Sequence, residues 1–130
     1  LARESGFALE LDDIENHSFL PDAAQNTADT EVFYTALEEG ESHFSRLFKA
    51  ADKDGKRLKY RAEFNSGSAR VKLEAIPQGH DFFNLRGSDN IVLFYTDRYP
   101  EQPLMIKGAG AGAEVTASGL VADIIRAGNF

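Results

Sequence analysis

The chain has 130 residues, of which 42% are hydrophobic, and it carries a formal net charge of −7 at pH 7. Its acidic balance argues against binding to nucleic-acid phosphates, which requires clustered lysine and arginine, and its lack of cysteine excludes a disulfide framework and thiolate chemistry. No apolar run approaches the length of a membrane span, so we expect a cytoplasmic protein with a single domain, residues 1–130, and one core.

The first third of the chain predicts two short elements and then a capped helix. Residues 1–5 have the pattern of a helix tail that Gly6 caps. Roughly alternating hydrophobicity over residues 8–14 predicts a strand that continues toward Phe19 and Leu20 and ends at Pro21. A polar connection follows, and Asp29 or Thr30 is suited to cap the next helix.

Two consecutive helices are expected between that cap and Gly55. Gly40 interrupts the helical pattern, and Ser42 is suited to start the second helix. The apolar faces predicted to enter the core are Val32, Phe33, Ala36 and Leu37 in the first helix and Phe44, Leu47, Phe48 and Ala51 in the second.

The second half of the chain predicts mainly β-structure. Residues 57–64 alternate, which is typical of a strand with an apolar face on the core and a charged face toward water. A turn follows, and residues 69–76 pair back as a hairpin. Residues 91–96 form an apolar strand, and a short strand follows a break at residues 100–103. Together these elements predict an α+β fold, a two-layer sandwich of a mainly antiparallel sheet with helices on one face.

A loop of alternating glycine and alanine, residues 108–113, leads into a C-terminal helix. Such glycines allow positive φ and let a ligand approach without meeting a Cβ, while a helix N-terminus suits an anion. Gly108, Gly110 and Ala113 fit the dinucleotide fingerprint G-x-G-x-x-G/A, but the βαβ unit of about 30 residues that it requires has no room after Ala113. Residue types alone support tight packing and ligand contact equally.

Other candidate sites are weaker. Residues 52–55 resemble the start of a calcium loop, but Arg61 stands where the final acidic ligand is needed, so a helix stop and turn is the better interpretation. No Ser/His/Asp set is credible. Three histidines lie far apart without the spacing of metal ligands: His17, His43 and His80.

Motifs at both ends of the chain resemble homoserine dehydrogenase. The first residues carry Leu1-Ala2-Arg3-Glu4-Ser5-Gly6, Leu9-Glu10-Leu11, Asp13-Ile14 and Leu20-Pro21, and the last carry the glycine loop, Val115-Thr116-Ala117, Gly119 and Ala122-Asp123-Ile124. Between them, Gly87-Ser88-Asp89-Asn90 followed by Phe94-Tyr95-Thr96 and Tyr99 is closer to the form fused to aspartate kinase. The resemblance covers nearly the whole chain.

The resemblance implies part of an oxidoreductase that interconverts aspartate 4-semialdehyde and homoserine with NADP or NAD, in threonine, methionine and isoleucine biosynthesis. It implies that Gly112 contacts the nicotinamide nucleotide, with Gly110, Ala111 and Ala113 in the same cofactor-binding loop. The family's catalytic lysine, substrate-binding acids, cation site and nucleotide-binding domain would lie upstream. The chain would therefore hold no catalytic residue and no metal ligand, and would be inactive alone.

The implied partners are the chain's own nucleotide-binding domain, a small-molecule substrate and a second copy bound through the sheet, without nucleic acid or membrane. The same α+β build also fits a different class of protein. That alternative is a non-enzymatic regulatory module that binds an amino acid and dimerises through its sheet.

Overall fold

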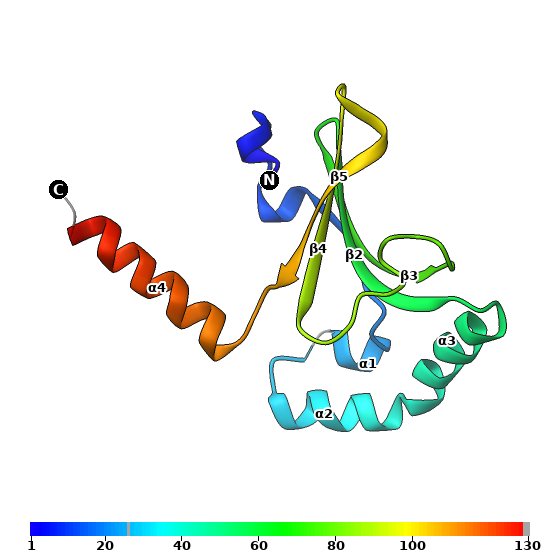
Figure 1. Ribbon diagram of the computed structural model, residues 1–130. Helices are drawn as coiled ribbons and strands as arrows, with labels where there is room; N and C mark the ends of the chain where they lie inside the picture. The colour runs from blue at the N-terminus through cyan, green and yellow to red at the C-terminus, as the bar shows by residue number, and fades with distance from the viewer. Residues whose placement is uncertain (26, 129–130) are drawn as a thin grey trace. The chain divides into compact units, whose positions relative to one another are not determined.

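A computed structural model describes residues 1–25 and 27–128, and the chain divides into two compact units, Leu1–Phe83 and Asn84–Phe130 (Figure 1). Helices and strands occur in both units, which confirms the α+β class. The described strands form two sheets where the sequence predicted one: β1-β3-β2 in the first unit and β4-β5 in the second. The single domain expected from the chain length stays a prediction.

The N-terminal segment of the first unit forms two 3-10 turns before its first strand. The turn η1, Arg3–Ser5, ends at Gly6 with φ +86°, as predicted. The strand predicted from residue 8 toward Leu20 is present only as β1, Ile14–His17. Its first part is wrong, because Leu11–Asp13 forms the turn η2. The backbone N–H of Glu10 donates to the Asp13 carboxylate at 2.8 Å, so an acidic side chain closes a turn where alternation suggested extension.

Three helices follow: α1 (Asp22–Gln25), α2 (Thr30–Glu39) and α3 (Glu41–Lys53). Asp29 caps α2, accepting from the N–H groups of Glu31 and Val32 at 2.9 and 3.2 Å. The junction between α2 and α3 is Gly40, which also takes the N-cap place predicted for Ser42. A Cβ at residue 40 would lie 2.7 Å from Pro21 Cγ, so a close approach requires glycine there.

The core of the first unit is small and consists largely of alanine. Its buried hydrophobic residues are Ala24, Ala36, Ala51 and Ile76. Phe48, predicted to lie in the core, is 62% exposed, and Val32 is 52% exposed. The alanines of the two apolar stripes are buried, while the larger residues Phe33, Leu37, Phe44 and Leu47 are half-buried.

The predicted hairpin is present as β2 (Arg57–Asn65) and β3 (Ser68–Ile76), which pair antiparallel from Arg57↔Ile76 to Asn65↔Ser68. The strand β1 joins β3 in parallel, from Ile14↔Ala69 to His17↔Lys72. The sheet is therefore mixed rather than purely antiparallel.

The charged face of this hairpin is more enclosed than alternation predicted. The side chain of Arg61 is only 25% exposed, and its guanidinium lies 2.8 Å from Glu74, while Arg70 lies 2.8 Å from Glu63. A third pair joins Lys72 to Glu74 at 2.6 Å. The hydrogen bond from Arg70 lowers the pKa of Glu63, and Arg61 adds to the effect against the opposing cost of burial. Ion pairing, rather than open water, satisfies these charges.

The second unit consists of β4 (Asp89–Thr96), β5 (Tyr99–Ala109) and α4 (Ala113–Gly128). The strands pair from Asp89↔Ala109 to Thr96↔Tyr99, with one irregularity between Phe94 and Thr96. The predicted break at residues 100–103 is wrong, since Pro100 and Pro103 lie within β5, as an edge strand permits. None of the described residues of this unit is buried. No helix in residues 1–25 or 27–128 is both long and apolar enough to cross a bilayer.

Candidate functional site

The glycine loop connects β5, which ends at Ala109, to α4, which begins at Ala113 (Figure 1). The Gly110 N–H donates to the Ser88 carbonyl at 3.0 Å, which ties the start of the loop to β4. At the other end the Gly112 carbonyl accepts from the Thr116 N–H at 3.0 Å, so Gly112 occupies the N-cap position of α4. The loop is therefore fastened at both ends and exposed between them.

The three glycines of the loop have different surroundings. Gly112 has φ +140°, a conformation that side-chain-bearing residues rarely adopt, and a Cβ there would meet no heavy atom within 4 Å. Gly108 also has open space at its Cβ position, but its backbone imposes no such restriction. At Gly110, by contrast, a Cβ would overlap the side-chain amide of Asn90.

The predicted cofactor-binding residues thus lie together in one exposed segment. Ala111 and Ala113 are exposed beside Gly110 and Gly112, directly before the first turn of α4. That turn contains Glu114, whose carboxylate opposes an anion at the helix N-terminus. The segment is accordingly better suited to a neutral ring or a ribose than to a phosphate.

Sequence reasoning assigned no role to the residues at the start of β4. The structure brings Ser88 and Asn90 to Gly110, and Asp89 lies 3.3 Å from Lys107 on the paired strand. In the sequence, the motif Gly87-Ser88-Asp89-Asn90 contributes only to the resemblance to the family. Its position beside the glycine loop depends on the register in which β4 pairs with β5.

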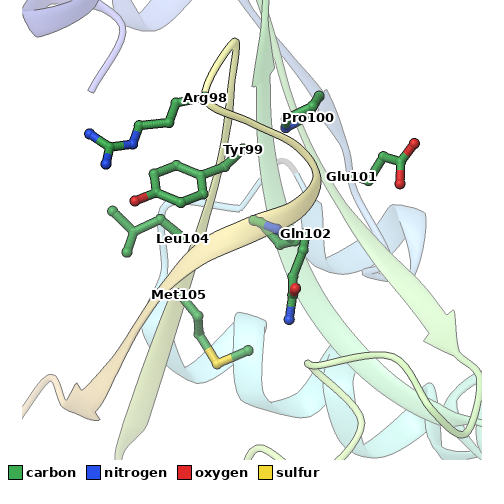
Figure 2. Close-up of a pocket in the computed structure, with 8 residues that line it drawn as sticks. Arg98, Tyr99, Pro100, Glu101, Gln102, Leu104 and Met105 are labelled. Carbon is green, nitrogen blue, oxygen red and sulfur yellow. The ribbon is translucent and has the colours of Figure 1, made fainter.

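A hollow of about 480 Å³ lies on the β4–β5 hairpin, lined by residues 98–105. Figure 2 shows Arg98, Tyr99 and Leu104 extending to one side of the hairpin and Glu101 to the other. The Arg98 guanidinium is 5.7 Å from the centre of the Tyr99 ring. One arginine and one distant glutamate do not form an acid–base pair, so this hollow offers no catalytic set.

A second hollow, of about 540 Å³, lies within the first unit between α3 and β3. Its polar groups are already engaged: Lys72 is 2.6 Å from Glu74, Asp54 is 3.1 Å from Lys56, and His43 Nε2 is 2.9 Å from the Phe19 carbonyl. A free amino acid needs an available cation and an available anion. The hollow therefore does not favour the regulatory-module alternative.

The histidines are used within the fold rather than gathered together. His17 lies 2.8 Å from Glu15, and His80 Nδ1 accepts from the Phe82 N–H at 3.1 Å. In the part of the chain that the structure describes, no three His, Cys, Asp or Glu side chains are grouped as a metal site. The calcium-like segment is a turn, since α3 ends at Lys53 and Gly55 has φ +66°.

Comparisons with known proteins agree over almost the full chain. A family model described as homoserine dehydrogenase matches residues 1–125. The chain is 40% identical over 132 residues to a maize chloroplastic bifunctional aspartokinase/homoserine dehydrogenase, covering 100% of this chain and 14% of the relative. A Schizosaccharomyces pombe homoserine dehydrogenase is 38% identical over 111 residues, which cover 84% of this chain and 30% of that enzyme.

A solved structure also matches, that of a Candida auris protein of unknown function. It gives a TM-score of 0.77 at 37% identity and covers 96% of this chain and 36% of the other. The chain thus spans a minor part of the length of the proteins it resembles, 14% in the bifunctional relatives from maize. The chain belongs to the homoserine dehydrogenase family.

Proposed function

We propose that the chain is part of an enzyme that interconverts aspartate 4-semialdehyde and homoserine with NADP or NAD, and that its glycine loop contacts the nicotinamide nucleotide. The observation that carries the proposal is the backbone conformation of Gly112 together with the open space around it. Its backbone requires glycine, yet nothing within 4 Å of its Cβ position uses the space that glycine leaves open. A glycine kept for packing would have a neighbour there, as Gly110 does. Gly6, Gly79 and Gly87 share a positive φ and open space without any such role, so the family match over the loop is what favours a nucleotide at Gly112.

The chemistry of the loop fits the neutral part of a dinucleotide. Backbone amides near the N-terminus of α4 can donate to a carboxamide or a ribose hydroxyl, while Glu114 opposes the pyrophosphate. When bound, the nicotinamide supplies or receives the hydride. The residues of this chain would orient the ring and limit its contact with water, and the proton would be handled elsewhere.

The remaining machinery would belong to a nucleotide-binding domain in a longer protein, and the 130-residue chain would be inactive alone. The exposed apolar residues of α4 support this partner, because a helix with no buried residue lacks the packing that normally stabilises it. They are Val115, Leu120, Val121, Ile124 and Ile125, each at least 45% exposed. We also propose that the longer protein contains an aspartate kinase region, by analogy with the bifunctional maize relative. For its location we propose the cytoplasm, whereas the maize relative is named chloroplastic.

Substitution of Gly112 in the full-length enzyme tests the cofactor contact. Alanine at residue 112 already introduces backbone strain at φ +140°. Valine adds a branched side chain in the open space and some further strain, which the unfolding midpoint without nucleotide measures separately. We expect Gly112→Val to raise KM for NAD(P)H about tenfold above that of Gly112→Ala, which corresponds to about 1.4 kcal/mol. Equal KM values in the two variants, with valine no worse than alanine, would remove the loop from the nucleotide site.

We further propose that two copies associate through the sheet of the second unit. Tyr95, Leu104 and Ile106 expose 60%, 48% and 57% of their surface there, and extended apolar patches usually mark interfaces. Sedimentation of the chain at tens of micromolar should give a dimer, and Ile106→Lys should shift it toward monomer. A wild-type monomer under these conditions would contradict the proposal.

A further inference from the structure

The start of β4 holds the glycine loop from two directions. Ser88 accepts the Gly110 N–H through its carbonyl at 3.0 Å, which fixes residue 110 in the plane of the sheet. Asn90 pairs with Gly108, so its side chain lies on the same face as residue 110, which is two positions after Gly108 and directly beyond the end of β5. Residue 110 is therefore in contact with β4 both at its backbone and above its Cα.

Only the Asn90 side chain explains why residue 110 is glycine. A Cβ there would overlap the amide nitrogen of Asn90 and lie 3.2 Å from Asn90 Cβ. The backbone makes no such demand, because Gly110 is not among the glycines with positive φ. An alanine at 110 would force the Asn90 amide to leave its place.

We propose that Asn90 is a positioning residue that sets the path of the loop from Gly110 to Gly112, and that Gly110 accommodates Asn90 rather than the dinucleotide. The inference rests on the proposed function of the loop and assigns a different role to each of two glycines in it. Gly112 faces the nucleotide, and Gly110 provides the room in which Asn90 supports the turn. Apart from the hydrogen bond to Ser88, this support depends on the shape of one side chain.

A double-mutant cycle in the full-length enzyme tests the inference. Gly110→Ala displaces Asn90, and Asn90→Ala removes its amide, so we expect each to raise KM for NADPH about five- to tenfold, with kcat at saturating nucleotide within about twofold of wild type. Because both changes remove the same support, the double variant should be no worse than the poorer single variant. Asn90→Leu keeps a similar branched shape without adding a charge beside the nucleotide, and it should keep KM near that of the wild-type enzyme.

The outcomes separate the inference from the proposal beneath it. If Gly110→Ala raises KM by the same factor in the wild-type and Asn90→Ala backgrounds, residue 110 itself meets the nucleotide and the inference is overturned. If Gly112→Val raises KM but Asn90→Ala does not, the loop contacts the nucleotide without help from Asn90. If neither Gly112→Val nor Asn90→Ala changes KM, the loop does not contact the nucleotide, and the proposed function of the loop is contradicted together with the inference. Should Gly110→Ala not fold, Asn90→Ala and Asn90→Leu, at an exposed position, decide the question: similar losses in both would overturn the positioning role.

Discussion

The two units of the chain differ in how far their apolar residues are buried. In the first unit, capped helices and a three-stranded sheet enclose a core around Ala36, Ala51 and Ile76. In the second, two strands and one helix leave every described residue at least partly accessible. A two-stranded sheet is marginally stable by itself, so we expect the second unit to be less stable than the first unless it gains contacts from the longer protein that we propose. The glycine loop lies in this less buried unit.

The strongest test of this contrast truncates one isoleucine in each unit. Ile76 is 3% exposed and Ile106 is 57% exposed. In the 130-residue chain, diluted until it is monomeric, we expect Ile76→Ala to lower the free energy of unfolding by about 2–4 kcal/mol through a cavity, and Ile106→Ala to change it by about 0.5 kcal/mol or less. Denaturant titration of both variants measures the difference. Equal losses would mean that the second unit has a core of its own.

A second test asks whether α4 is covered in the longer protein. Ile124 is 69% exposed, so Ile124→Gln should change the stability of the 130-residue chain by about 0.5 kcal/mol or less. In the full-length protein the same substitution should cost about 2–3 kcal/mol, because it would place an amide at an apolar contact. Thermal unfolding of both proteins provides the measurement. A loss of the same size in each would show that α4 meets no further partner.

The smallest expected effect concerns charge, and it compares the ion-pair network of the first unit with a single pair in the second. Glu63→Gln removes a carboxylate whose pKa is lowered by Arg70, and it should lower Tm by about 1–3 °C at pH 7. A carboxyl group with a lowered pKa in the folded state stabilises the protein at pH values above its pKa in the unfolded state, which is near 4.3. This stabilisation is lost as the pH falls from that value through the pKa of the folded state. The difference in Tm should therefore decrease below about pH 4.3 and vanish once the pH is below the lowered folded-state pKa of Glu63.

The control for the charge experiment is Asp89→Asn, which breaks the isolated pair between Asp89 and Lys107 at 3.3 Å. One exposed pair contributes little, so its effect at pH 7 should be smaller than that of Glu63→Gln. Thermal scans from about pH 2 to about pH 7 on both variants test the network. A difference for Glu63→Gln that does not decrease as the pH falls would point to lost packing instead of lost charge.

Features governed by a few neighbouring residues could be predicted from the sequence. The Asp29 cap, the interruption at Gly40 and the hairpin of β2 and β3 each follow from local propensity. The composition of the core could not be predicted in this way, because Ala51 and Phe48 share an apolar stripe and tertiary packing selects between them. Separation into two sheets likewise depends on pairings between distant segments.

The candidate site shows the same division. Glycine spacing located the loop and indicated that a positive φ was possible, and Gly112 has one. The relation between Asn90 and Gly110 spans 20 positions of the chain and depends on the register of β4 and β5. A one-residue shift in that register would turn Asn90 to the opposite face. No local pattern contains this information.

The prolines of β5 bear on how copies of the chain can come together. A proline has no N–H to offer to an incoming strand, and Pro100 and Pro103 lie at the hairpin end of an edge strand. The prolines therefore oppose backbone pairing with a strand of another chain along this half of the edge. Natural sheets use prolines in the same way to avoid aggregation. The other half, residues 104–109, keeps its donors, so any growth of the sheet would begin beside the glycine loop and would compete with it for space.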